Sequence, residues 1–188
     1  MNIVIFGPPG AGKGTQSKFI VEKFNLFQLS TGELLRNEMK NKTELGSQIA
    51  SIINSGELVS DEIVSNLIEK FISNEAYKNR LIFDGYPRNL NQAKNLGNLL
   101  NVNKQKIDLV LKLSVSLETI KKRILERQSQ EKREDDNEEI ATKRYKTYEN
   151  SIEPVINYYK QLKLLKVVNG EATITKINGE ISELIEAI

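Results

Sequence analysis

A glycine-rich turn between an apolar run and an amphipathic segment constrains this chain more than any other feature. Residues 2–6 read Asn-Ile-Val-Ile-Phe, which predicts a short buried strand, and residues 7–15 follow directly as Gly-Pro-Pro-Gly-Ala-Gly-Lys-Gly-Thr. The next apolar side chains, Ile20, Val21 and Phe24, recur at helical spacing. A turn of small residues between a strand and a helix lets backbone N–H groups converge on an anion.

This turn matches the P-loop pattern G-x-x-x-x-G-K through Lys13, but position 14 is Gly and the hydroxyl arrives at Thr15. Lys13 supplies a positive charge that can follow a phosphoryl group during its transfer. An ordinary strand–helix turn would use glycine for packing alone and would not need the lysine. We therefore expect ATP phosphates to be bound by Gly10, Ala11, Gly12, Lys13, Gly14 and Thr15.

Segments of strand and helix character alternate along the rest of the chain. Strand-like runs occur at 26–29, 81–83, 109–113 and 164–168, with helical apolar stripes between them. This alternation favours a parallel sheet covered on both faces. We predict an α/β fold of the P-loop NTPase type, with three layers and a parallel five-stranded sheet. We also expect Pro154 to kink or end the helix in which it lies.

Two segments depart from the alternation and are interpreted as insertions. Residues 30–59 carry helical patterns with no strand between them, and residues 126–136 are almost wholly polar, which predicts a charged loop. The predicted core then comprises residues 1–29, 60–125 and 137–188.

Composition excludes several kinds of chemistry. The 188 residues contain no Cys and no His, which excludes disulfides, thiolate zinc sites and Ser–His–Asp triads. Lys and Arg number 27 against 25 Asp and Glu, a net charge of +2, so we expect neither nucleic acid nor a membrane as partner. No apolar run approaches the roughly 18 residues of a membrane span, and the N-terminus has no basic leader, so we expect a cytoplasmic protein.

Three further motifs follow the turn in order. Residues 30–36 read Ser-Thr-Gly-Glu-Leu-Leu-Arg, residues 56–59 read Gly-Glu-Leu-Val, and residues 84–88 read Asp-Gly-Tyr-Pro-Arg, with Gln92 after them. Together with the P-loop they resemble the nucleoside monophosphate kinases, and most closely the adenylate kinases, over essentially the whole chain. The resemblance implies reversible Mg²⁺-dependent transfer of the γ-phosphoryl group of ATP to AMP, giving two ADP. It also implies that 30–59 is an AMP-binding insertion and 126–136 a short lid, and that the protein is a monomer.

The resemblance assigns the acceptor site residue by residue. Arg36 and Arg88 would bind the AMP phosphate, for which a guanidinium offers a bidentate fork. Gln92 would read the adenine edge, since an amide both donates and accepts. Asp84, at a strand end, would hold Mg²⁺ through water. The full set implied for AMP is Thr31, Arg36, Glu57, Leu58, Val59, Gly85, Tyr86, Pro87, Arg88, Gln92, Arg133 and Arg144.

The charged segment near residue 130 resembles the short lid of the same family. Arg127 would cover the base and phosphates of ATP, and Arg133 and Arg144 would grip the transferring group and the acceptor phosphate. Arg123, four residues before Arg127 on one helix face, is a supporting candidate. The backbone near Ala172 would touch the ATP adenine. The implied catalytic set is Lys13, Arg88, Arg127, Arg133 and Arg144.

The chain departs from the family pattern at two places. Lys132 stands where the family usually has Gly, and Ser60 stands where it has Pro, which leaves the hinge geometry open. The longer family lid often carries zinc-binding cysteines; this chain has the short form and no cysteine, so no structural zinc is expected. We expect residues 30–59 and 126–136 to move over the core when nucleotides bind.

Three alternative functions remain. A UMP/CMP kinase shares the fold and chemistry but usually lacks the Thr at position 31 and the Gln at position 92, both present here. A regulatory module that binds ATP without an acceptor has no need of the arginines beyond Lys13. A kinase of a small metabolite has no recognisable acceptor pocket in this sequence.

Overall fold

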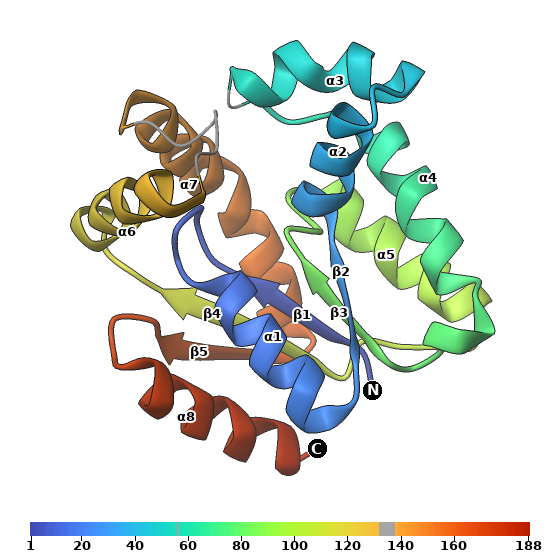
Figure 1. Ribbon diagram of the computed structural model, residues 1–188. Coiled ribbons are helices and arrows are strands. Elements are labelled where there is room, and N and C mark those ends of the chain that lie inside the picture. Colours follow the sequence, from blue (N-terminus) through green and yellow to red (C-terminus); the bar gives the residue numbers. More distant parts are fainter. Residues whose placement is uncertain (56, 132–137) are drawn as a thin grey trace.

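The computed structural model describes residues 1–55, 57–131 and 138–188 (Figure 1). One parallel sheet in the order β2-β3-β1-β4-β5 forms its centre. The strands are β1 (Ile3–Phe6), β2 (Phe27–Ser30), β3 (Leu81–Asp84), β4 (Leu109–Ser114) and β5 (Leu165–Asn169). The predicted five-stranded parallel sheet is confirmed.

Helices connect the strands and cover the sheet. They are α1 (Lys13–Phe24), α2 (Thr31–Lys40), α3 (Glu44–Asn54), α4 (Asp61–Ile72), α5 (Leu90–Val102), α6 (Leu117–Glu131), α7 (Glu138–Gln161) and α8 (Ile174–Glu186), with one 3₁₀ turn at Glu75–Tyr77. None of the helices in the described residues is long and apolar enough to cross a membrane.

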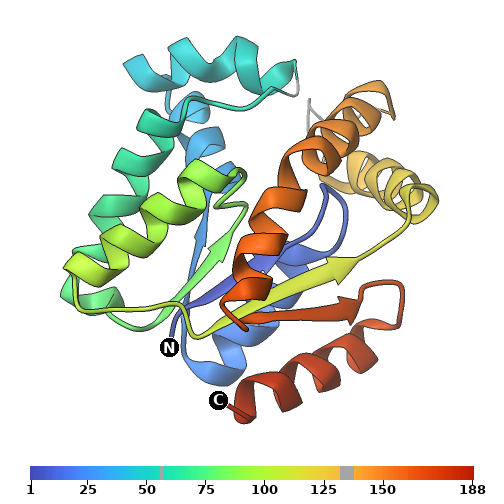
Figure 2. The same ribbon diagram turned by 180° about the vertical axis from the view of Figure 1, so that it is seen from behind.

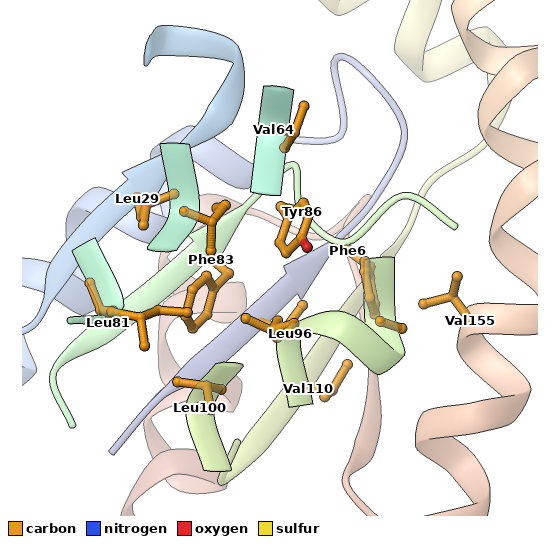
Figure 3. Packing of buried hydrophobic residues seen from close by; sticks show 14 of the residues in the cluster. Phe6, Leu29, Val64, Leu81, Phe83, Tyr86, Leu96, Leu100, Val110 and Val155 are labelled. Atoms are coloured by element: carbon orange, nitrogen blue, oxygen red, sulfur yellow. The ribbon is translucent and has the colours of Figure 1, made fainter. Parts of the chain in front are cut away.

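Alternate side chains of each strand enter two separate cores. Val4 and Phe6 of β1 join the core under α4, α5 and α7, whereas Ile3 and Ile5 join the core under α1 and α8. Figures 1 and 2 show these two helical layers on opposite faces of the sheet. Figure 3 shows the packing on the first face, around Phe83 and Leu96. The three-layer prediction is confirmed.

Between β2 and α4 the described residues form two helices, α2 and α3, and no strand. Ser30 caps α2 by accepting a hydrogen bond from the backbone N–H of Glu33 at 3.4 Å, and Thr43 caps α3 through the N–H of Gly46 at 2.9 Å. A Cβ on Gly46 would lie 2.1 Å from the carbonyl oxygen of Glu38, so only glycine permits this close approach of the two helices.

The structure differs from the sequence-based predictions at two places. The segment predicted as a charged loop over 126–136 is helical through Glu131, because its residues are good helix formers and α6 packs on α7 through Ile120, Ile124 and Ala141. Of the two effects expected of Pro154, a kink or an end of the helix, the end does not occur, since α7 continues to Gln161. Packing of Ile152, Val155 and Tyr159 against the sheet outweighs the one hydrogen bond that proline removes.

Candidate active site

A cleft of about 1350 Å³ opens at the carboxyl ends of the strands. Its walls come from the β1–α1 turn, α2, the segment after α3, the β3–α5 turn, α6, α7 and the β5–α8 turn. Figure 1 shows α2 and α3 rising on one side of this end of the sheet and α6 and α7 on the other. Ligands of open parallel sheets bind at this edge, and the volume exceeds what one drug-sized ligand requires.

The β1–α1 turn forms the floor of the cleft. Gly10 (φ 84°) and Gly12 (φ 93°) adopt left-handed conformations, and a Cβ on Gly10 would lie 3.0 Å from Cγ1 of Ile124. Gly12 is the N-cap of α1, and no side chain caps the helix or places an acidic group in its first turn. The N–H groups of the first turn of α1 are therefore not paired with a capping side chain.

Lys13 lies at the centre of the cationic groups in the cleft. Its Nζ donates hydrogen bonds to the carbonyl oxygens of Gly7 at 2.7 Å and Pro8 at 3.1 Å. Burial lowers the pKa of Lys13 to about 8; Asp84 opposes this shift, while Arg88 and other arginines of the cleft add to it. A desolvated lysine among positive charges is stabilised when phosphate oxygens arrive.

The end of β3 connects the sheet to the acceptor side of the cleft. Asp84 is 7% exposed, and its Oδ2 accepts a hydrogen bond from Nε2 of Gln28 at 2.9 Å. Thr31 donates from Oγ1 to the carbonyl oxygen of Gly85 at 3.0 Å, which joins the start of α2 to the strand end. Gly85 is left-handed (φ 79°), and a Cβ there would lie 3.0 Å from the Thr31 hydroxyl. The motifs at 30–36 and 84–88 therefore form one wall.

Arg88 projects from this wall in a fixed orientation. Its Nε donates to the carbonyl oxygen of Gly85 at 2.7 Å, and its backbone N–H donates to Oε1 of Gln92 at 2.7 Å. Burial, with Arg144 and Arg36 nearby, lowers the pKa of Arg88 to about 10 in spite of Asp84. Because the repulsion between these guanidinium groups falls when an anion binds, this wall is suited to a phosphate.

Gln92 lies at the inner end of the same wall and is 3% exposed. Its Nε2 donates to Oδ1 of Asp61 at 2.7 Å, and its backbone N–H donates to Oδ1 of Asn89, the N-cap of α5, at 2.8 Å. Tyr86 does not line the cleft: its ring is buried in the core (Figure 3), and its hydroxyl donates to the carbonyl oxygen of Gln92 at 3.3 Å. Tyr86 therefore supports the wall from behind.

The opposite side of the cleft is formed by α6, α7 and the β5–α8 turn. Arg123 donates from Nη1 to the carbonyl oxygen of Ala11 at 3.3 Å and from Nη2 to that of Gly170 at 2.9 Å, so it joins two turns of the floor. Ala172, Ile174 and Ile177 provide apolar lining beside this junction.

Comparison with known proteins decides the family. The family model of adenylate kinase matches residues 5–164. The chain belongs to the adenylate kinase family. It is 43% identical to the adenylate kinase of Pelagibacter ubique (strain HTCC1062) over 99% of this chain and 100% of that one. It is also 43% identical to the adenylate kinase of Prochlorococcus marinus (strain MIT 9515), over 97% of both chains, and 39% identical to that of Flavobacterium psychrophilum, over 98% of both. The family resemblance stated from the motifs is confirmed.

Most residues that the adenylate kinase pattern suggested meet in the one cleft. Arg133 lies outside the described residues, and Tyr86 is behind the wall. The predicted site residues that line the cleft are Gly10, Ala11, Gly12, Lys13, Gly14, Thr15, Thr31, Arg36, Glu57, Leu58, Val59, Asp84, Gly85, Pro87, Arg88, Gln92, Arg127, Arg144 and Ala172, together with the supporting candidate Arg123.

The sequence patterns do not point to Gln28 and Asp61, whose side chains bond to those of Asp84 and Gln92. Each is polar and lies at or near the end of an element, but nothing in the linear sequence shows which side chain it contacts. Among the described residues no group of three or more carboxylates is placed to hold a metal ion.

Proposed function

We propose that this chain catalyses the reversible Mg²⁺-dependent transfer of the γ-phosphoryl group of ATP to AMP, giving two ADP. The observation that carries this proposal is the convergence of cations from separate segments on one cleft. Those among the described residues are Lys13, Arg36, Arg88, Arg127 and Arg144. A module that only binds ATP would need the cations near the glycine-rich turn. It would not need those on the wall formed by the motifs at 30–36 and 84–88.

ATP would bind on the β1–α1 turn. Backbone N–H groups of residues 10–15 and the ammonium of Lys13 would bind its phosphates, and Arg127 on α6 would cover them. The apolar lining near Ala172 provides a surface for the adenine ring. Arg123 would support this half by holding the two floor turns together.

AMP would bind against the wall formed by the motifs at 30–36 and 84–88. Arg36 and Arg144 lie close enough to Arg88 to lower its pKa, and the three would bind the phosphate together. Gln92 would meet the adenine edge. The remaining groups proposed for this half, by family pattern or by their place in the cleft, are Thr31, Glu57, Leu58, Val59, Gly85, Pro87 and Arg133.

Electrostatics would supply most of the catalysis. Two unit charges 4 Å apart repel by about 4 kcal/mol at the effective dielectric of a protein surface, and the cations would offset this repulsion between the nucleotides. The acceptor phosphate oxygen is already an anionic nucleophile, so the reaction needs no general base. A chain without histidine can therefore carry out this reaction.

Asp84 is suited to Mg²⁺, which usually takes one or two carboxylates from the protein and its other ligands from phosphates and water. Gln28 orients this carboxylate through Oδ2, and the carboxylate faces the cleft near Lys13. We propose that Asp84 holds Mg²⁺ through water, and the ion would neutralise phosphate charge.

We further propose that a cytoplasmic monomer closes residues 30–59 and 126–136 over residues 1–29, 60–125 and 137–188. Lys143 of α7 donates to Oε1 of Glu57 at 3.3 Å, so the two sides of the cleft mouth already touch. A two-headed adenosine polyphosphate should reduce the radius of gyration in small-angle scattering, at a mass equal to one chain. An unchanged scattering curve would contradict closure, and a doubled mass would contradict the monomer.

The acceptor panel is the experiment that tests the proposed reaction. With MgATP and equal amounts of AMP, CMP, UMP or GMP, we expect kcat/KM for AMP to exceed the others by at least about 10-fold, as the loss of a base hydrogen bond implies. Thr31 and Gln92 are the residues that favour AMP. Faster turnover of CMP or UMP would instead identify a UMP/CMP kinase, and ATP hydrolysis without any acceptor preference would identify a regulatory module.

The pKa of Lys13 predicts proton uptake on nucleotide binding. At pH 8.5 a lysine with a pKa of about 8 is largely deprotonated in the free protein, and bound phosphates restore its proton. Binding of MgATP should take up about 0.75 proton at pH 8.5 and about 0.1 at pH 7. Calorimetry in buffers of different ionisation enthalpy measures this number. Lys13→Met should abolish the uptake at pH 8.5; equal uptake in both proteins would contradict the assignment.

A further inference from the structure

The side-chain amide of Gln92 is held on both sides by the protein. Its Nε2 donates to Oδ1 of Asp61 at 2.7 Å, and its Oε1 accepts from the backbone N–H of Arg88 at 2.7 Å. The amide is almost fully buried, so water does not compete for these bonds. One N–H and one lone pair of the amide remain for a ligand.

Asp61 is itself held in place. This residue opens α4, and both oxygens of its carboxylate accept hydrogen bonds from Nδ2 of Asn89, at 2.9 and 3.0 Å. Asn89 cannot turn its amide without losing the bond by which its Oδ1 caps α5 at the N–H of Gln92. The orientation of the carboxylate is therefore set by a helix cap.

These contacts permit only one orientation of the Gln92 amide. A rotation of the amide by 180° would place Oε1 against the Asp61 carboxylate and Nε2 against the N–H of Arg88. An acceptor would then face an acceptor at Asp61, and a donor would face a donor at Arg88. Both pairs would be buried, where an unmade hydrogen bond is most costly. Asp61, together with the backbone N–H of Arg88, thus determines which end of the amide is oxygen and which is nitrogen.

We propose that Asp61 is a positioning residue that sets the preference for the acceptor base, selecting 6-aminopurines over 6-oxopurines through Gln92. This inference rests on the proposed function, in which Gln92 meets the base. The fixed oxygen accepts from the 6-amino group of adenine, and the fixed nitrogen donates to a neighbouring ring nitrogen. A 6-oxo group would place an acceptor against Oε1, and the amide could not turn to accommodate it.

Asp61→Asn tests this positioning role. The new amide has both a donor and an acceptor, so it can pair with either orientation of Gln92, and only the backbone N–H of Arg88 then opposes the turned amide. We expect the ratio of kcat/KM for AMP to that for IMP to fall about 10-fold, within the range for a hydrogen bond to a charged group, with KM for MgATP unchanged. Glu62→Gln is the matched control, since it removes an exposed carboxylate from the same first turn of α4 and should leave the ratio unchanged.

A double-mutant cycle separates positioning from a general structural effect. In the Gln92→Ala background, Asp61→Asn should change kcat/KM for AMP by less than about 2-fold, because the group through which Asp61 acts is gone. An equal loss in both backgrounds, or an unchanged AMP/IMP ratio in the single variant, would overturn the inference.

The wild-type protein provides a second measurement that does not depend on the folding of a variant. Purine riboside 5′-monophosphate lacks the 6-amino group and loses one hydrogen bond, whereas IMP meets a repulsive contact. We expect IMP to be the poorer acceptor by at least about 3-fold. If IMP is equal or better, the amide is free to turn and the inference is wrong. Failure of wild-type protein to phosphorylate AMP would instead overturn the proposed function.

Discussion

Lys13→Met is expected to lower kcat/KM for phosphoryl transfer from MgATP to AMP by about 10³-fold or more, as for other groups that stabilise a phosphoryl-transfer transition state. Methionine keeps an unbranched side chain, one atom shorter, and removes the ammonium with its charge and its hydrogen bonds. In the free protein the lysine Nζ bonds to the carbonyl oxygens of Gly7 and Pro8, inside the loop where phosphates would bind. Initial rates in a coupled assay, over a range of MgATP and AMP, measure the loss.

The same substitution should not destabilise the free protein. Because burial lowers the pKa of Lys13 to about 8, keeping the lysine charged in the folded state costs free energy relative to the unfolded chain. The unfolded chain holds the proton up to its ordinary pKa, so this cost is fully present below pH 8 and fades as pH rises toward 10.5. At pH 7 the melting temperature of Lys13→Met should therefore equal or exceed that of the wild type.

Lys70→Met is the matched control for this experiment, because Lys70 is exposed on α4 away from the cleft. It should keep wild-type kinetics. A Lys13→Met protein that retains more than about a tenth of the wild-type rate would contradict the role proposed for the lysine. A melting temperature of Lys13→Met several degrees below that of the wild type would contradict the expectation that burying the charged lysine costs stability.

Arg88→Ala is expected to lower kcat/KM for AMP by about 10²- to 10³-fold while the affinity for MgATP changes by less than about 3-fold. The two effects should differ because Arg88 lies on the wall formed by the motifs at 30–36 and 84–88, and not on the glycine-rich turn. Its Nε donates to the carbonyl oxygen of Gly85, and Arg36 and Arg144 lie nearby. Titration of MgATP without acceptor, followed by steady-state kinetics with AMP, separates the two effects.

Arg88→Lys shows whether geometry or charge is responsible. Lysine keeps the charge but has neither the planar fork nor the Nε–H that bonds to Gly85, so we expect its rate to lie closer to that of Arg88→Ala than to the wild type. Arg80→Lys is the control, because Arg80 bonds to Asn25 outside the cleft. If MgATP affinity and transfer both survive in Arg88→Ala, an ATP-binding regulatory module becomes the better description.

Local sequence patterns were sufficient for most of the secondary structure. Each of the strands predicted at 2–6, 81–83 and 109–113 lies within one residue of its predicted bounds, because burial periodicity depends on near neighbours. The prediction of a loop at 126–131 was wrong because it rested on composition and not on burial periodicity. A polar composition was interpreted as a loop, although the same residues form a helix when Ile120 and Ile124 anchor it on α7.

The sequence alone determined the chemistry of the two halves of the site: a glycine-rich turn with Lys13, and an ordered set of arginine-bearing motifs without histidine or cysteine. Only the tertiary structure decided which side chains hold the site residues in place. Gln28 meets Asp84 across 56 positions, and Asp61 meets Gln92 across 31. Such pairs form because parallel strands and their helices bring distant segments to the same edge of the sheet, and no periodicity of neighbouring residues records that meeting.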